Sequence, residues 1–178
     1  MIAFVRSNTS RLRAIIDGLL AYSRVEARVE TGPVELGRLA LELRDALALL
    51  IAEKNAELVI GELPTVEGAC VHFTQLIQNL VGNALAYTDA DLPLVQISGE
   101  RTGDGVRLVV EDNGPGIPEA DRARVFDVFA RLQLDGEIEG TGLGLSICQR
   151  IVHQYGGTIE CAASALGGAA FVIRLPGA

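Results

Sequence analysis

Two runs of β-branched residues, at 94–100 and 106–112, lie on either side of the segment Thr102-Gly103-Asp104-Gly105. Glycine and aspartate favour tight hairpin turns, because they adopt the backbone conformations that such turns require. The sequence therefore predicts an antiparallel pair of strands joined by a short turn. A sheet built from such a pair needs a second layer to cover its apolar face.

Helical periodicity alternates with further strand signals along the rest of the chain. Leucines spaced three and four residues apart, beginning at Leu36, predict a helix over 36–53. Further helices are expected at 70–87, 119–129 and 143–155, and further strands at 57–61, 158–163 and 169–175. The predicted fold class is an α/β two-layer sandwich, with a mixed, mainly antiparallel sheet and helices on one face.

The composition limits the partners of such a domain. The 178 residues suffice for one α/β domain with a helical extension, and 49% of them are hydrophobic while only 4% are aromatic. The core is therefore expected to consist mainly of Leu, Val, Ile and Ala. The formal net charge is −8 at pH 7, which argues against a broad basic surface for DNA or RNA.

The cysteines and the apolar runs exclude further classes of protein. The three cysteines form no C-x-x-C pair and have no histidine at metal-ligand spacing, so neither a zinc site nor a disulfide framework is expected. The first residues acquire charge after five positions, and no apolar run approaches membrane-spanning length. We therefore expect no secretion signal, no direct membrane insertion and a cytoplasmic location.

Residues 2–27 carry apolar side chains along one face of a predicted helix. This face comprises Val5, Leu12, Ile15, Leu19 and Tyr22, widened by Ile16 and Leu20. Two interpretations remain open: the helix folds onto its own domain, or it is one helix of an intermolecular bundle. Gly32-Pro33 ends the helix, because proline cannot continue a helical hydrogen-bond ladder. The sequence thus predicts a helix and linker at 1–32 and a globular domain at 33–178.

The predicted helix over 70–87 carries Gln75, Asn79 and Asn83 at successive four-residue steps, so the two asparagines share one face. On its own, such a face is typical of an exposed helix. Carboxamide oxygens are also hard ligands of the kind that suit Mg²⁺.

Asp112 ends a β-branched run directly before Asn113-Gly114-Pro115-Gly116. Its carboxylate is expected where a strand opens into a tight loop, a position typical of turn-initiating aspartates and also suited to ligand recognition. Gly114 and Gly116 lack a Cβ and would let the backbone come close to a bound molecule.

A second glycine-rich segment, Gly140-Thr141-Gly142-Leu143-Gly144-Leu145, precedes the predicted helix over 143–155. Backbone N–H groups at the start of a helix lack intrahelical partners and favour an anion. The apolar residues Leu143, Leu145 and Ile147 are expected to pack the helix against the core.

Phe126 and Phe129 lie between the two glycine-rich segments, followed by Arg131 and the polar stretch 133–139. Their spacing is typical of core packing, and the same side chains would serve as an apolar hinge for a polar loop. Loops of this kind open and close in microseconds to milliseconds.

Four segments occur in a fixed order: QLIQNLVGNALAYT at 75–88, VEDNGPGIP at 110–118, VFDVFARL at 125–132 and GTGLGLSI at 140–147. Together they make the chain resemble the ATP-binding catalytic domain of bacterial sensor histidine kinases, in the class that includes gyrase, Hsp90 and MutL and has the Bergerat fold. Residues 1–32 similarly resemble the second helix of a dimerisation and phosphotransfer hairpin. This resemblance favours the bundle interpretation and implies a homodimer through residues 2–27.

The resemblance implies roles for individual residues. Asp112 would pair with the exocyclic amino group of adenine, Asn83 would ligate Mg²⁺, and Asn79 would support the metal or the phosphates. Relatives that hydrolyse ATP commonly carry a glutamate at the position of Asn79, so an amide there favours phosphate transfer to a protein. The other residues expected to contact ATP are Tyr87, Gly114, Gly116, Ile117, Phe126, Phe129, Arg131, Gly140, Thr141, Gly142, Leu143, Gly144 and Leu145.

The sequence departs from the family pattern at two points. Ala86 stands where the family usually carries a lysine or arginine, so one phosphate-pairing cation is missing. The family's phosphoacceptor, a histidine followed by an acidic residue, is also absent, because His72 is followed by Phe and His153 by Gln.

The resemblance therefore implies an ATP-dependent protein histidine kinase that acts on a histidine of a dimerisation domain outside this chain. A response-regulator aspartate would receive the phosphate next. The alternatives are a module that binds ATP or ADP without transferring phosphate, a GHKL-type ATPase, and a serine kinase of the anti-sigma-factor type.

Overall fold

A computed structural model describes residues 16, 18–20, 22, 23, 25, 29–88, 90–130 and 141–177. A five-stranded sheet with the order β2-β4-β5-β7-β6 forms one layer. Its strands are β2 (Glu57–Ile60), β4 (Leu94–Thr102), β5 (Gly105–Asp112), β6 (Thr158–Ala163) and β7 (Ala169–Pro176). Only β2 and β4 run parallel, and the other neighbours are antiparallel. The predicted mixed, mainly antiparallel sheet is confirmed.

The hairpin that the sequence predicts joins β4 to β5, with Thr102 paired to Gly105. Gly105 has a φ of +154°, and a Cβ added there would lie 2.7 Å from the backbone nitrogen of Gly177. This turn therefore requires glycine for its close approach to the end of β7.

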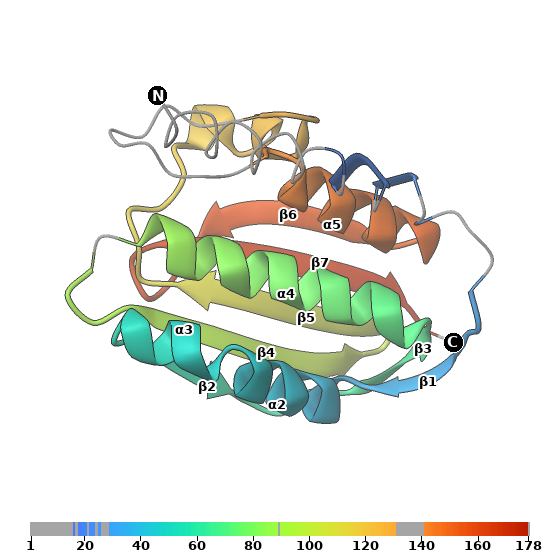
Figure 1. The fold of residues 1–178 in the computed structure, drawn as a ribbon. Coiled ribbons are helices and arrows are strands. Elements are labelled where there is room, and N and C mark those ends of the chain that lie inside the picture. The colour runs from blue at the N-terminus through green and yellow to red at the C-terminus, as the bar shows by residue number, and fades with distance from the viewer. Residues whose placement is uncertain are drawn as a thin grey trace.

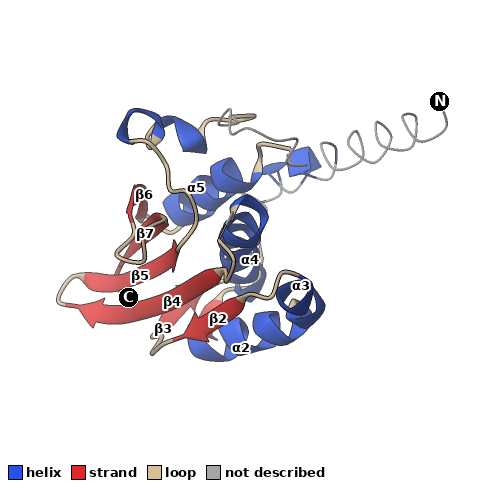
Figure 2. Ribbon diagram, turned by 90° about the vertical axis from the view of Figure 1, so that its left-hand side faces the viewer, coloured by secondary structure: helices blue, strands red, loops and turns tan. Residues whose placement is uncertain are grey.

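The helices lie together on one face of the sheet, as Figure 2 shows from the side. They are α2 (Leu36–Ala46), α3 (Ala48–Glu53), α4 (Cys70–Tyr87) and α5 (Gly144–Gln154). In Figure 1, α4 crosses the front of the sheet between α5 and the α2–α3 pair. The predicted two-layer arrangement is therefore confirmed. Helix α4 begins and ends at the residues that the sequence predicted.

The core lies between α4, α5 and the sheet. Leu76, Leu80 and Leu85 of α4 are all buried, as the helical spacing predicts. They pack in one continuous apolar cluster that also includes Leu108 and Ile173 of the sheet. The two helices that carry the candidate site residues are thus fixed by the same core.

Three expectations about secondary structure need correction. The helix predicted over 36–53 is divided at Leu47, where φ is −95° and ψ is 4°, although hydrogen bonds from Leu47 to Leu43 and from Ile51 to Leu47 continue across the bend. The helix predicted over 119–129 is instead two 3₁₀ turns, η1 (Glu119–Asp121) and η2 (Arg124–Phe126). Asp127 after η2 is extended and ends the helical conformation.

The third correction is a small sheet that the sequence did not predict. Strands β1 (Gly32–Glu35) and β3 (Thr65–Gly68) pair antiparallel, with Val34 opposite Val66. Four residues are too few to show an alternating pattern, and Pro33 argues against a strand unless it lies at an edge.

The N-terminal segment touches the globular domain at several described residues. Residues 16, 18–20, 22 and 23 are helical, as predicted for this stretch. Val25 is buried, and the guanidinium carbon of Arg150 lies 4.2 Å from the centre of the Tyr22 ring. Ile16, Leu19 and Leu20 are exposed. Val5, Leu12 and Ile15 lie outside the described residues.

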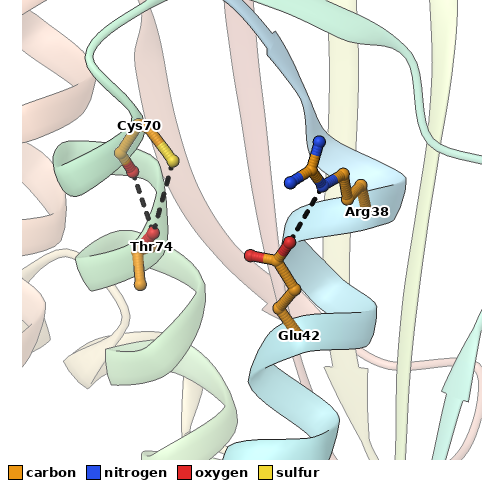
Figure 3. Close-up of polar contacts among 4 residues, drawn as sticks. All are labelled: Arg38, Glu42, Cys70 and Thr74. Carbon is orange, nitrogen blue, oxygen red and sulfur yellow. Dashed lines mark hydrogen bonds and ion pairs between the residues drawn. The ribbon is translucent and has the colours of Figure 1, made fainter.

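The exposed surfaces of α2 and α4 carry local polar contacts (Figure 3). Arg38 Nε donates to Glu42 Oε1 over 2.9 Å, and Thr74 Oγ1 donates to the backbone carbonyl of Cys70 over 2.9 Å. Exposed contacts of this kind contribute little to stability. Among the described residues, no helix is both long and apolar enough to cross a bilayer.

Candidate functional site

Asn79 and Asn83 lie on the face of α4 that meets the start of α5. Asn79 Nδ2 donates a hydrogen bond of 3.2 Å to the backbone carbonyl of Gly144. A Cβ added to Gly144 would lie 3.8 Å from Asn79 Cγ and 3.9 Å from Asn83 Nδ2. The predicted sharing of one helical face is therefore observed, and it brings both amides to the first residue of α5.

Asp112, the last residue of β5, is buried beneath two loops. Its Oδ1 accepts backbone N–H bonds from Gly114 over 2.9 Å and from Ala169 over 3.1 Å. Among the described residues, no donor bonds Oδ2. One oxygen of the carboxylate is thus anchored by the backbone while the other keeps its hydrogen-bonding capacity.

The electrostatics of Asp112 reflect a balance between burial and these donors. Burial raises the pKa of its carboxyl group, because water that would solvate the charge is excluded. The N–H groups of Ala169 and Gly114 lower the pKa by favouring the charged form, and the neighbouring charge of Glu111 raises it. The bond from the Gly114 N–H, two residues further along the chain, is that of a turn-initiating aspartate, as one interpretation of the sequence predicted. Burial of the carboxylate is also compatible with a recognition site.

The loop after Asp112 runs beside the C-terminal end of α4. A Cβ added to Gly114 would lie 3.6 Å from Thr88 Cα and 3.8 Å from the backbone oxygen of Tyr87. Gly116 has a φ of +72°, a conformation that favours glycine. Tyr87 and Ile117 are both half-buried, and Ile117 packs against the main core.

The segment before α5 forms a tight entry to the helix. Gly142 has a φ of +70°, and its carbonyl accepts a 3.0 Å hydrogen bond from the N–H of Phe129. Thr141 Oγ1 accepts from the N–H of Leu143 over 3.3 Å. Because α5 begins at Gly144, the N–H groups of its first turn lack intrahelical acceptors and point out of the helix start.

The apolar residues of this region divide into buried and exposed ones. Leu143 is buried and Leu145 half-buried, which agrees with the predicted packing of α5. Phe126 is buried and meets Phe171 of β7 edge-on at 6.2 Å between ring centres. Phe129 is 53% exposed and has a φ of +65°, so the core-packing interpretation holds for Phe126 and is wrong for Phe129.

Other residues that the sequence singled out either lie outside the described part of the chain or make none of these contacts. Arg131, Gly140 and the polar stretch 133–139 lie outside the described residues. Ala86 is exposed at the end of α4. Of the two histidines, His72 is buried and its Nδ1 lies 2.7 Å from the Tyr155 hydroxyl, whereas His153 is exposed on α5.

Sequence reasoning missed the turn between β6 and β7 as part of the site. Ala169 supplies one of the two donors to Asp112, and the N–H of Gly168 bonds the Asp112 carbonyl over 3.1 Å. The only available signal was the pair Gly167-Gly168 before a strand, which indicates a turn but not what the turn contacts.

Comparison with known proteins shows which family the chain is similar to. The model of the family described as "Histidine kinase-, DNA gyrase B-, and HSP90-like ATPase" matches residues 68–178. Cyanobacterial phytochrome A of Nostoc sp. strain PCC 7120 is 34% identical over 178 residues, covering 98% of this chain and 23% of the phytochrome. The adaptive-response sensory kinase SasA of Synechococcus sp. strain JA-3-3Ab is 32% identical, covering 96% of this chain and 47% of SasA.

Solved structures show the same relationship. Full-length ShkA in complex with AMPPNP superposes with a TM-score of 0.77 at 27% identity, covering 98% of this chain and 38% of ShkA. The catalytic domain of the histidine kinase ThkA, solved without nucleotide, superposes with a TM-score of 0.72 at 29% identity, covering 83% of this chain and 98% of that domain. The chain thus spans less than half the length of both curated relatives but nearly the whole of the isolated catalytic domain.

The predicted resemblance is confirmed by the family match, by these relatives and by the shared fold. The chain belongs to the family of histidine kinase-, DNA gyrase B- and HSP90-like ATPases, and it contains the ATP-binding catalytic domain of the histidine kinase branch.

Proposed function

We propose that this chain transfers the γ-phosphate of ATP to a histidine of a dimerisation domain, from which a response-regulator aspartate receives it. The observation that carries the proposal is the buried carboxylate of Asp112, whose Oδ1 is held by two backbone N–H groups. This carboxylate stands at the end of β5, beside the loop that meets α4.

Asp112 would select the purine. Its Oδ2 keeps acceptor capacity for the exocyclic amino group of adenine, whereas guanine presents a carbonyl oxygen at the same ring position. Two acceptors facing each other would leave a buried group unpaired, which costs about 1–3 kcal/mol. Gly114 lets the backbone approach the base, with Tyr87 and Ile117 close to the same loop.

Asn83 would bind Mg²⁺ through its carboxamide oxygen, and the N–H groups at the start of α5 would bind phosphate oxygens. The described residues contain no cluster of three or more His, Cys, Asp or Glu side chains, so the metal would take its other ligands from phosphates and water. Thr141, Gly142 and Gly144, and in the undescribed stretch Gly140 and Arg131, belong to this proposed phosphate site. Catalysis would rest on positioning and on charge stabilisation.

The acceptor histidine would come from outside this chain. His72 is buried and bonded to Tyr155, so its ring cannot reach a bound nucleotide without breaking the packing between α4 and α5. The exposed Ile16, Leu19 and Leu20 support a role for residues 2–27 as one helix of a dimeric bundle. Because ATP and response regulators are intracellular, the proposed place of action is the cytoplasm.

The proposal is tested by phosphotransfer in trans. The chain is mixed with an isolated dimerisation bundle that carries a candidate histidine, with Mg²⁺ and with ATP labelled at the γ-phosphate. Acid-labile label on the bundle is expected, and it should disappear when the bundle histidine is replaced by glutamine.

Three other outcomes would contradict it. Nucleotide binding with no transfer to any bundle would favour a binding module, for which the exposed Ala86 is the supporting feature. Steady phosphate release without an acceptor would favour an ATPase. Acid-stable label on a partner would favour a serine kinase.

A further inference from the structure

The turn between β6 and β7 is held next to Asp112 by a set of hydrogen bonds. Within it, the N–H of Ser164 bonds the carbonyl of Gly168 over 2.9 Å, and the N–H of Leu166 bonds Ser164 Oγ over 2.9 Å. Ser164 Oγ also donates to Glu111 Oε2 over 2.9 Å. The turn is therefore tied to the strand residue directly before Asp112.

Gly168 is the point at which this turn touches Asp112. A Cβ added to Gly168 would overlap Asp112 Oδ1, and it would lie 2.5 Å from the Gly114 nitrogen and 2.6 Å from the Asp112 carbonyl oxygen. Real Cβ atoms essentially never come this close to a backbone atom. The requirement for glycine thus comes from close approach, because Gly168 is not among the glycines with a left-handed backbone.

The close contact between Gly168 and Asp112 determines which backbone N–H groups can bond the Asp112 carboxylate. With no side chain at Gly168, the next residue, Ala169, can bring its N–H to within 3.1 Å of Asp112 Oδ1. The same oxygen accepts the Gly114 N–H from the opposite loop. The carboxylate is thereby held between two loops by one oxygen, with its orientation set from both sides.

We infer that Gly168 is a positioning residue for purine recognition: its missing side chain lets the β6–β7 turn hold Asp112 by Oδ1, so that Oδ2 faces the base. The inference rests on the proposed nucleotide site. It predicts that Gly168 acts on nucleotide binding mainly through the Asp112 side chain, and not through the general stability of the turn.

The test is a thermodynamic cycle of nucleotide affinity. A non-hydrolysable ATP analogue with Mg²⁺ is titrated into the natural chain, Gly168→Ala, Asp112→Asn and the double variant. Gly168→Ala should weaken binding about tenfold to a hundredfold, the worth of one hydrogen bond to a charged group. In the Asp112→Asn background the same change should cost clearly less affinity, because only the displacement of the backbone around Gly114 then remains.

Equal losses from Gly168→Ala in both backgrounds would overturn the inference, because Gly168 would then act through something other than Asp112. Undiminished binding by Asp112→Asn alone would instead overturn the proposed nucleotide site. The two failures are therefore distinguishable.

Two glycines provide matched controls. Gly167 precedes Gly168 in the same turn and has a φ of +108°, but a Cβ there would meet nothing within 4 Å. Gly167→Ala therefore strains the turn without pushing on Asp112. Gly103, in the β4–β5 turn, also has open space. Both alanine variants should bind the analogue within about twofold of the natural chain, and a loss in Gly167→Ala equal to that in Gly168→Ala would contradict the inference.

A second variant keeps the test decisive if Gly168→Ala does not fold, as judged by circular dichroism. Ala169→Pro removes the N–H that bonds Asp112 Oδ1 and puts the ring Cδ against that oxygen, while leaving Gly168 unchanged, and proline is tolerated at the first residue of a strand. Because this N–H lowers the pKa of Asp112, its loss should move the acid limb of nucleotide binding to higher pH. An acid limb identical to that of the natural chain would overturn the inference.

Discussion

Asn79 and Gly144 are 65 positions apart in the chain, and the Nδ2 of Asn79 donates a 3.2 Å hydrogen bond to the Gly144 carbonyl. This bond ties the middle of α4 to the first residue of α5, so the two helices that carry the proposed metal and phosphate ligands are held in register. Cys148, one turn further along α5, is buried, and its Sγ donates to the Leu76 carbonyl of α4 over 3.8 Å. Burial raises the pKa of its thiol to about 12.

Asn79→Ala should therefore lower both stability and nucleotide affinity. Loss of the bond to Gly144 should reduce the free energy of unfolding by about 1–2 kcal/mol, measured by urea denaturation. Gln78→Ala changes the exposed neighbouring residue of α4 and should have little effect. An Asn79→Ala variant as stable as Gln78→Ala would show that the contact does not tie the helices.

Tyr155→Phe should destabilise the end of the domain opposite the nucleotide site. The Tyr155 hydroxyl accepts the Ala69 N–H over 2.9 Å and lies 2.7 Å from His72 Nδ1, so its removal leaves both groups unpaired. The expected cost is about 1–3 kcal/mol in thermal or urea unfolding, although the ring still stacks on Phe73. Tyr22→Phe keeps its ring contact with Arg150 and should change stability little. Equal stabilities of the two variants would contradict this account.

His72 should make the stability of the domain pH-dependent. Burial lowers the pKa of its imidazole below the ordinary value of about 6.5. Below that pH, the unfolded chain therefore binds a proton at His72 more readily than the folded chain does. The stabilising contribution of neutral His72 is complete above pH 6.5 or so, and it is lost as the pH falls below that value.

Urea denaturation between pH 7.5 and pH 5 measures this dependence. His72→Gln should flatten the fall in unfolding free energy at acid pH, because glutamine does not titrate. His153→Gln, at the exposed histidine of α5, should leave the fall unchanged. The prediction is wrong if the two variants show the same slope.

Asp112→Asn should stabilise the folded protein at neutral pH while it weakens nucleotide binding. Because burial raises the pKa of Asp112, the stability that the protonated carboxyl provides is lost as the pH rises through its folded-state pKa. An amide keeps Oδ1 as an acceptor and carries no charge. We expect a gain of about 0.5–2 kcal/mol at pH 7 that shrinks toward pH 3, whereas Asp104→Asn in the exposed β4–β5 turn should show neither effect.

The sequence predicted most of the fold because its main elements have long, clear patterns. The helix over 70–87 and the strands on either side of Gly103 were placed to within two residues by periodicity and turn chemistry. The segment 119–129 was misassigned because Val125, Phe126 and Phe129 have helical spacing, although only the first two are buried. Spacing alone cannot reveal that Asp127 is extended.

The candidate site could be predicted only as separate motifs. Asp112, Asn79 and Asn83 stand at recognisable positions, but the contacts that orient them come from distant parts of the chain. Ala169 reaches Asp112 from 57 positions away, and no local pattern in the β6–β7 turn specifies that contact. Register across the sheet, and not residue type, creates it.

If Asp112 gives this site its preference for adenine, calorimetry in the presence of Mg²⁺ should detect that preference. Non-hydrolysable analogues of ATP and GTP are titrated into the natural chain, Asp112→Asn and the control Asp104→Asn. We expect the natural chain and Asp104→Asn to bind the ATP analogue about tenfold to a hundredfold more tightly than the GTP analogue, and Asp112→Asn to lose at least about tenfold in affinity for the ATP analogue. Equal binding of the two analogues by the natural chain, or full affinity in Asp112→Asn, would contradict this expectation.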